Sequence, residues 1–353
     1  MVIDCHAHWI PPEVADSLRQ RRAAPRIAHT PDGERFFTYQ GNRRFDAALG
    51  DLNVRRSLMR RHGIATQLLS LAGLFGIDCL PVEESAPLVR AFNNAVIEAQ
   101  RAFPDEFAGL AALPLADIGR ACSELERVCA EGIRGAILPA DGFRTVSEAA
   151  RFIPLFDLGE RVRCHFFVHP GPIEPVPEVQ LRDLRDDSAW QRRIVLATQA
   201  RLSEVMTTLN FSGYLDSYPN VTVQVANLGG TIPFLLERMD EVAREQPGDD
   251  APPSMRTRRC YVDTASFGPR AIEMAVACYG ADRVMLGTDC PIFDSARMMQ
   301  SLAEARLDTK TRERVCFRNA YEMLVGDRKP LTFHLAANIP LTNAEPRGTS
   351  RKF

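Results

Sequence analysis

The chain has 353 residues, of which 45% are hydrophobic and 25% charged, a composition typical of a soluble globular protein of one large domain or two small ones. The formal net charge of -2 gives no basic excess for nucleic-acid binding. No run of about 18 apolar residues and no N-terminal signal pattern occurs, so we expect no membrane partner. The nine cysteines form no CxxC pair, which favours buried thiols in a reducing compartment and a cytoplasmic protein.

Eight short apolar segments recur along the chain, each of about strand length. They are rich in Val, Ile, Leu and Phe and lack strict alternation, which is typical of strands buried on both faces of a parallel sheet. In chain order these segments are residues 2–8, 66–72, 107–114, 134–140, 164–170, 221–230, 260–266 and 284–291.

Between these segments, apolar residues at helical spacing predict six helices, at residues 84–102, 118–130, 147–158, 197–209, 233–243 and 269–279. Eight strands that alternate with helices predict an α/β fold, a (β/α)8 TIM barrel. An open doubly wound sheet is the alternative. It ranks second because the first turn between strand and helix, residues 7–12, contains no glycine-rich phosphate loop.

Two segments depart from the alternation of strands and helices. Residues 27–45 predict a small β-hairpin inserted after the first strand, since Pro31-Asp32-Gly33 is a turn signal followed by aromatic residues. Residues 329–353 are polar and contain prolines, which predicts a loosely ordered tail or an arm that packs on a neighbour. The predicted organisation is therefore a barrel over residues 1–328, with the insertion near its mouth, and a C-terminal tail.

Four residues at predicted strand ends have side chains that bind metals. His6 and His8 alternate on the first strand, so both imidazoles face the same side. His169 and Asp289 end the fifth and eighth strands, and a carboxylate there needs a partner, which is a metal, an arginine or backbone amides. Because barrel enzymes place their sites at the carboxyl ends of strands, the four residues predict a Zn2+ site with an open position. His165, deeper in the same strand as His169, is interpreted as structural.

With these motifs the chain resembles the metal-dependent amidohydrolase superfamily, in the branch that contains aminocarboxymuconate semialdehyde decarboxylase and related aromatic-acid decarboxylases. The resemblance covers about residues 1–325. It implies a (β/α)8 barrel that binds one divalent metal, usually zinc and alternatively an ion such as Mn2+, through His6, His8, His169 and Asp289. The motifs that carry it include Asp4-Cys5-His6-Ala7-His8, Val168-His169-Pro170, Leu228-Gly229-Gly230, Val262-Asp263-Thr264-Ala265 and Leu286-Gly287-Thr288-Asp289.

Two arginines extend the resemblance. Arg43 matches an arginine that grips a substrate carboxylate, although Arg44 is a close competitor for this position. Arg238 matches an arginine that reaches the partner subunit's site, which implies a homodimer. An arginine fork suits a planar carboxylate. The alternative for each is a surface salt bridge, which we prefer for Arg44, and for Arg238 the partner would be an acid on its own helix.

One position departs from the family pattern. The family has a histidine before the glycine pair that follows the sixth strand, and this histidine is its usual acid/base group. Here the residue is Asn227, which forms hydrogen bonds but carries no proton at neutral pH. We expect Asn227 to orient a water or a substrate oxygen, and Asp289 to serve as both ligand and proton shuttle. Trp9 and Phe293 follow two of the ligands, and each is interpreted as lining the pocket or as packing.

The leading functional hypothesis is a metal-dependent, non-oxidative decarboxylase of a small aromatic or unsaturated carboxylate, a carboxy-lyase. The feature that favours it is the arginine pair beside the predicted metal site. The alternative is a metal-dependent hydrolase or hydratase that uses a metal-bound water on an amide, lactone or C–C bond, since zinc lowers the pKa of its water to about 7. A binding protein that lost activity at Asn227 is a third hypothesis, disfavoured by four intact ligand residues.

Overall fold

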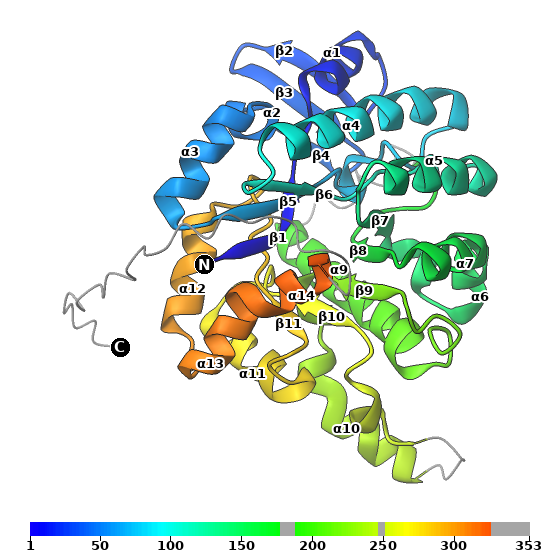
Figure 1. The fold of residues 1–353 in the computed structure, drawn as a ribbon, viewed down its shortest axis with the longest axis vertical. Helices are drawn as coiled ribbons and strands as arrows, with labels where there is room; N and C mark the ends of the chain where they lie inside the picture. Colours follow the sequence, from blue (N-terminus) through cyan, green and yellow to red (C-terminus); the bar gives the residue numbers. More distant parts are fainter. Residues whose placement is uncertain (177–187, 246–250, 326–353) are drawn as a thin grey trace, which may run out of the picture.

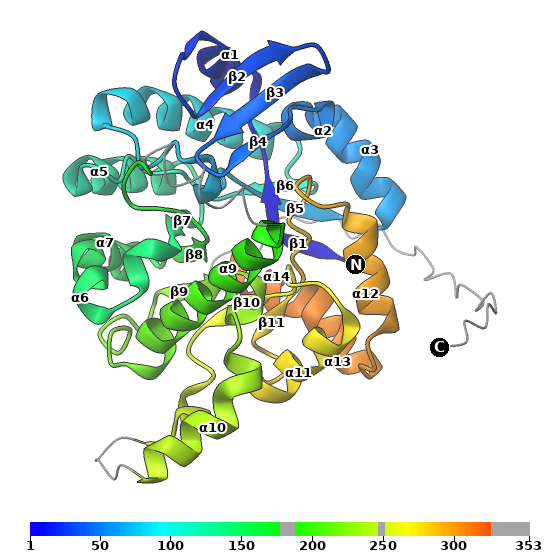
Figure 2. The ribbon, with the colours of Figure 1, turned by 180° about the vertical axis from the view of Figure 1, so that it is seen from behind.

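The computed structural model describes residues 1–176, 188–245 and 251–325, which form a barrel surrounded by helices (Figures 1 and 2). Its strands are β1 (Ile3–His8), β5 (Thr66–Ser70), β6 (Phe107–Gly109), β7 (Gly135–Pro139), β8 (His165–His169), β9 (Thr222–Val225), β10 (Tyr261–Asp263) and β11 (Val284–Met285). The helices are α1 (Pro12–Gln20), α2 (Ala47–Gly50), α3 (Leu52–His62), α4 (Val82–Ala102), α5 (Ile118–Ala130), α6 (Val146–Ala149), α7 (Ile153–Val162), α9 (Trp190–Met206), α10 (Ile232–Glu245), α11 (Pro269–Tyr279), α12 (Ser295–Glu304), α13 (Thr309–Glu313) and α14 (Asn319–Val325).

The eight barrel strands run parallel and close into a ring. One arc has the order β1-β5-β6 and the other β11-β10-β9-β8-β7. Two isolated parallel bridges, between Ala111 and Ala136 and between Ala7 and Cys290, join the arcs. Each of the eight predicted apolar segments contains one of these strands. The structure therefore confirms the TIM barrel, and the open doubly wound sheet is wrong because the first and last strands meet.

The burial pattern explains why these sequences form a barrel. Every residue of β1, β5, β7 and β8 is buried, as expected for strands covered on both faces. Helix α5 shows the complementary pattern, since Ala121, Leu125 and Val128 form one buried stripe. Its first turn is closed by Asp117, whose side chain accepts a hydrogen bond from the Arg120 amide.

The insertion after β1 is a three-stranded antiparallel sheet rather than a hairpin. It consists of β2 (Arg26–Thr30), β3 (Gly33–Thr38) and β4 (Gly41–Arg44), in the order β2-β3-β4. The prediction missed β4 because this short strand is polar and mostly exposed, so it has no hydrophobic pattern. Phe36 of β3 is buried against Phe75, with ring centroids 5.0 Å apart, and this contact attaches the sheet to the loop after β5.

The predicted helices are all present, with one divided: residues 147–158 form α6 and α7, separated by a short 3-10 turn at Ala150–Phe152. Helices α1, α2, α3, α12 and α13 had not been predicted. Within the described residues no helix is both long enough and apolar enough to cross a bilayer. The predicted tail at residues 329–353 lies outside the described residues.

Candidate active site

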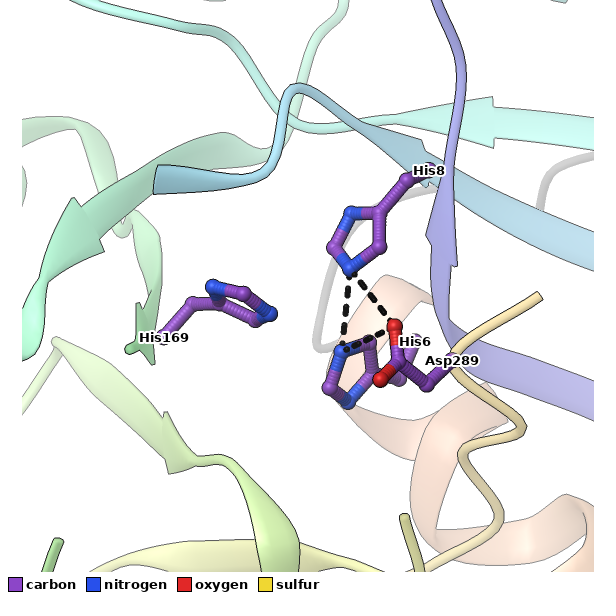
Figure 3. Close-up of side chains that lie close together, drawn as sticks. All are labelled: His6, His8, His169 and Asp289. Carbon is purple, nitrogen blue, oxygen red and sulfur yellow. Dashed lines mark hydrogen bonds and ion pairs between the residues drawn. The ribbon is translucent and has the colours of Figure 1, made fainter. Parts of the chain in front are cut away.

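The four predicted ligands converge at the carboxyl ends of three barrel strands (Figure 3). One nitrogen from each of His6, His8 and His169 and one oxygen from Asp289 all lie within 4.8 Å of one another. His6 Nε2 lies 3.1 Å from His8 Nε2 and 3.5 Å from Asp289 Oδ1, and His8 Nε2 lies 3.1 Å from the same oxygen. Residues distant in the sequence thus form one compact and largely buried cluster.

The outward nitrogen of each imidazole faces an oxygen atom of a neighbouring group. His169 Nδ1 lies 2.8 Å from the Pro170 carbonyl, which can only accept, so this nitrogen carries the proton. His8 Nδ1 lies 3.1 Å from the Ser70 hydroxyl, which donates to the Ala7 carbonyl and therefore accepts from His8. His6 Nδ1 faces Asp263 Oδ1 at 3.1 Å. In the neutral rings these contacts leave the three Nε2 lone pairs directed into the cluster.

This arrangement fits a divalent cation. Three lone pairs and a carboxylate oxygen face one another, and no hydrogen-bond partner within the described residues satisfies Asp289 Oδ1. Ligands about 2.0–2.1 Å from one tetrahedral ion lie roughly 3.3 Å apart, close to the shorter separations observed here. Nitrogen and carboxylate oxygen donors suit Zn2+ and Mn2+ alike. The chain's own residues thus bring four suitable ligand atoms together at one place.

Burial and neighbouring charges shift the pKa values of the cluster residues in different directions. Burial opposes protonation of His6, but Asp263 and Asp289 outweigh it and raise the pKa of His6 to about 9. Burial, reinforced by a charged His6, holds the pKa values of His8 and His169 well below their ordinary range. Burial also raises the pKa of Asp289. Without a cation, the cluster therefore places its one positive charge on His6.

The backbone at this end of the barrel is strained. Asp289, Asn227, Leu228 and Phe267 all have positive φ, and each follows β9, β10 or β11. Non-glycine residues seldom adopt this conformation, and such residues cluster at functional sites. Asn227 has a φ of 53°, and its backbone N–H donates to Asp263 Oδ1 at 3.1 Å. The buried Oδ1 of its side chain has no hydrogen-bond partner in the described part of the chain. That the Asn227 side chain points toward a water or a substrate oxygen stays a prediction.

Arg43, on β4, lies within electrostatic range of the cluster. Although its side chain reaches solvent, burial of the guanidinium lowers its pKa, and Asp289 and Asp46 are the charges that oppose this shift. Arg43 and Arg44 both line a cavity of about 270 Å³ with Asp46, Leu49, Pro291 and Ile292. The insertion therefore brings two cations to the segment that follows Asp289.

The other predicted substrate-binding residues lie in different surroundings. Trp9 is buried, and its indole donates to the Gly50 carbonyl at 3.1 Å and packs against Phe92, which supports the packing interpretation. Phe293 is 45% exposed and stacks edge-on against Phe267, with ring centroids 4.9 Å apart. Arg238 is exposed on α10, and within the described residues no hydrogen bond or ion pair connects it to the cluster.

Several residues that hold the ligands were not predicted. Ser70 and Asp263 each contact the outward nitrogen of a ligand histidine. Asp4 accepts hydrogen bonds from the His6 and Thr288 amides, the Thr288 hydroxyl and Gln67. Ser70 is paired with His8 across β1 and β5, so only knowledge of the strand register would have identified it.

The model of the amidohydrolase family matches residues 3–325 of this chain. The chain belongs to the amidohydrolase family. Gamma-resorcylate decarboxylase of Rhodococcus jostii is 27% identical over 297 residues, which span 78% of this chain and 88% of that protein. The 2-amino-3-carboxymuconate-6-semialdehyde decarboxylase of Dictyostelium discoideum is 24% identical over 293 residues, which span 80% of this chain and 79% of that protein.

A solved structure gives the same architecture. The dihydroxybenzoic acid decarboxylase of a Polaromonas species, solved with bound manganese and the inhibitor 2-nitroresorcinol, superimposes with a TM-score of 0.71 at 22% identity. The match covers 94% of this chain and 99% of that one. At this identity the likeness shows the fold of the amidohydrolase family, in agreement with the strand order described above.

Proposed function

We propose that this amidohydrolase-family protein is a metal-dependent, non-oxidative decarboxylase of a small aromatic or unsaturated carboxylate. The observation that carries the proposal is the cluster of His6, His8, His169 and Asp289, with Arg43 within electrostatic range. Relatives that match most of the chain are decarboxylases of gamma-resorcylate and of 2-amino-3-carboxymuconate-6-semialdehyde. Both of these substrates are small unsaturated carboxylates, which a cationic pocket would attract.

Each residue has a part in this reaction. A divalent ion, Zn2+ or Mn2+, held by the four ligands supplies Lewis-acid charge for the oxygen atoms of the substrate. Arg43 binds a carboxylate through its planar fork and fixes the ring. Asp289 delivers a proton to the carbon that carries the departing carboxylate. Asn227 donates a hydrogen bond to a substrate oxygen and transfers no proton.

The test is a panel of aromatic and muconate-type carboxylates incubated with the Mn2+- or Zn2+-loaded protein in H2(18)O. We expect one CO2 released per product, with a product lighter than the substrate by CO2 and free of newly bonded (18)O. Incorporation of one (18)O into the product without CO2 release would instead establish the hydrolase or hydratase. An Asp289→Ala protein serves as the control for background decarboxylation.

We further propose that the protein is a homodimer in which Arg238 contributes to the partner subunit's site. Arg238 is exposed, and no described acid pairs with it, although Glu237 and Asp240 lie on the same helix. Asp240 instead accepts a hydrogen bond from the Ser254 amide. Phe234, one helical turn before Arg238, is 76% exposed, and α10 projects from the barrel (Figure 1). A second copy would cover this apolar surface.

A mixing experiment tests the shared site. Arg238→Ala and Asp289→Ala subunits, each inactive alone, are combined and allowed to exchange. A mixed dimer contains one complete site, so we expect activity to return. Arg244→Ala, on the same helix but paired with Glu241, is the matched control and should retain activity. Absence of recovery in demonstrably mixed dimers would show that each barrel works alone.

We also propose a cytoplasmic location, since Cys5 and Cys260 are buried free thiols that resemble small core residues. Fractionation of the native host, with detection of the protein by antibody, tests this location.

A further inference from the structure

Arg55, on α3, is a fully buried cation. Its guanidinium donates only to uncharged oxygens: the carbonyls of Ala48, His8 and Cys290 and the side-chain oxygen of Gln67. Within the described residues no carboxylate forms an ion pair with it. Burial of a cation among neutral oxygens is costly, so arginine is seldom buried without an acid. The identity of these oxygens is therefore informative.

Two of the oxygens belong to the segments that carry ligands. Arg55 Nη2 lies 2.7 Å from the carbonyl oxygen of His8, which is itself one of the four cluster residues. Arg55 Nη1 lies 3.2 Å from the carbonyl oxygen of Cys290, the residue after Asp289. One guanidinium thus spans the ends of the first and last barrel segments.

These two segments meet at an irregular seam of the barrel. We define the seam as the contact between residues 5–8 and residues 286–290. Strand β11 has only two residues, so the seam depends on individual hydrogen bonds instead of a continuous ladder. The Asp289 amide donates to His6 O at 2.7 Å, and the His8 amide donates to Cys290 O at 2.8 Å. Three of the four cluster residues stand on this seam.

The hydrogen bonds of Arg55 continue across the seam on its inner side. Gln67 accepts from Arg55 at 3.4 Å and donates to Asp4 Oδ2 at 2.8 Å. Asp4 in turn accepts from the Thr288 amide at 2.9 Å and from the Thr288 hydroxyl at 2.6 Å. The chain Arg55–Gln67–Asp4–Thr288 therefore connects α3, β5, β1 and the segment after β11 with buried polar groups. Such a network fixes the relative positions of its members when every member is satisfied.

We propose that Arg55 is a positioning residue that clamps the seam and thereby sets the separation of His6 and His8 from Asp289. The inference rests on the proposed metal site. Arg55 contacts no ligand side chain and acts through the His8 and Cys290 carbonyls. Lysine is a poor replacement, because a single ammonium cannot span three carbonyls and an amide as a planar fork does.

The experiment compares Arg55→Lys and Arg55→Met with Arg56→Met in the full chain after removal of metal. Arg56 is the next residue on α3, and its guanidinium pairs with Glu106 at the surface. Hydrogen–deuterium exchange is followed in peptides covering residues 1–10 and 284–292, with 133–139 as an internal reference. The affinity of each refilled protein for Mn2+ is then measured by competition with a chromophoric chelator.

We expect the seam peptides of the Arg55 variants to exchange at least about tenfold faster, with the reference peptide unchanged, and Mn2+ affinity to fall by about 10–100-fold. The Arg56 variant should match the wild type in both measurements. Unchanged seam exchange in a folded Arg55 variant would overturn the proposal, as would faster exchange throughout the barrel, which indicates a general loss of stability. If neither Arg55 variant folds, Gln67→Met, which interrupts the same network, decides by the same outcomes.

The exchange measurement uses metal-free protein, so it judges the role of Arg55 even if the proposed function fails. A wild-type protein that binds no divalent metal would contradict the proposed function alone. Faster seam exchange in the Arg55 variants would still establish the clamp.

Discussion

His169 and His165 lie on the same strand and the same side of it, four residues apart, yet their surroundings differ. Both nitrogens of His165 have partners in the barrel interior, the Thr222 hydroxyl at 2.9 Å and the Gln224 amide oxygen at 3.4 Å. Within the described residues His169 has a hydrogen-bond partner only at Nδ1, and its Nε2 faces the cluster at the mouth. Saturation of hydrogen bonds, more than residue type or burial, distinguishes the structural histidine from the candidate ligand.

The same difference separates two layers of buried polar side chains in the barrel. The inner layer lies in the barrel interior, and the outer layer is the ligand cluster at the mouth. In the inner layer, Asp4, Gln67 and Gln224 all have hydrogen-bond partners, so polar groups are buried without unmet donors or acceptors. In the outer layer, one nitrogen from each of three imidazoles and Asp289 Oδ1 face one another, and within the described residues Asp289 Oδ1 has no hydrogen-bond partner. The inner layer holds strands together, and the outer layer is prepared for a cation.

Replacement of one histidine in each layer gives the largest expected effect. His169→Ala removes a ligand, so we expect loss of bound metal and a fall in decarboxylase activity of about 10³-fold or more, as for loss of a group on which catalysis depends. His165→Gln should keep the metal and most of the activity, and lower the free energy of unfolding by about 1–3 kcal/mol, because buried partners lose hydrogen bonds. Metal analysis and denaturant unfolding measure both. Equal metal loss in the two variants would refute the comparison.

Asn227→His tests whether the outer layer accepts an acid/base group. Histidine tolerates the positive φ at this position better than most residues, so the backbone can be retained. We expect turnover to rise by about 10²-fold and the pH profile to gain a limb near pH 6.5, where a histidine titrates. Asn227→Ala provides the control for loss of the amide. A profile without a new limb would show that residue 227 does not face the reacting carbon.

Asp263→Asn alters a group that links the two layers. Asp263 faces His6 Nδ1 and also accepts hydrogen bonds from Gln224 and the Asn227 amide. Removal of its charge should lower Mn2+ affinity by about 10–100-fold without abolishing binding. Asp282→Asn, which affects a surface pair with Arg258, is the matched control. Affinity equal to the wild type in calorimetric titrations would mean that His6 needs no carboxylate to orient it.

Asp78→Asn asks whether an unsatisfied buried carboxyl is by itself the mark of a ligand. Asp78 is buried, its Oδ1 has no hydrogen-bond partner within the described residues, and burial raises its pKa from 3.8 to about 7. Between about pH 4 and pH 7 the Asp78 carboxyl therefore keeps its proton in the folded chain but has lost it in the unfolded chain. The stability that this group contributes is complete below about pH 4 and is lost by about pH 7.

The Asn variant should therefore gain stability over the wild type as pH rises through this window, by up to about 4 kcal/mol at pH 8. Its metal content should not change, since Asp78 lies outside the cluster. Thermal unfolding at pH 4, 6 and 8 measures the trend. Loss of metal, or a gain in stability that is the same at every pH, would contradict the interpretation.

The sequence was sufficient to predict the barrel, because each buried strand is a local run of apolar residues. It was also sufficient to predict the four converging residues, because His6, His8, His169 and Asp289 lie at the ends of these runs. The partners of these residues were not predictable, since Ser70 and Asp263 depend on which strands are neighbours and in what register. Arg55 was not predicted for a related reason: in a helix with few apolar residues, its sequence context is the same as that of Arg56 and Arg60, which are not fully buried. Strand β4 escaped because it is polar.

The most direct test of the account is a metal titration of the protein after treatment with a chelator. Mn2+ is added in steps, and bound metal and CO2 release from an accepted aromatic carboxylate are measured on the same samples. The account predicts no turnover in the stripped protein, activity that rises in proportion to bound metal, and saturation at about one ion per chain, the number that one set of four ligands holds. Full CO2 release by metal-free protein, or saturation that His169→Ala leaves unchanged, would contradict it.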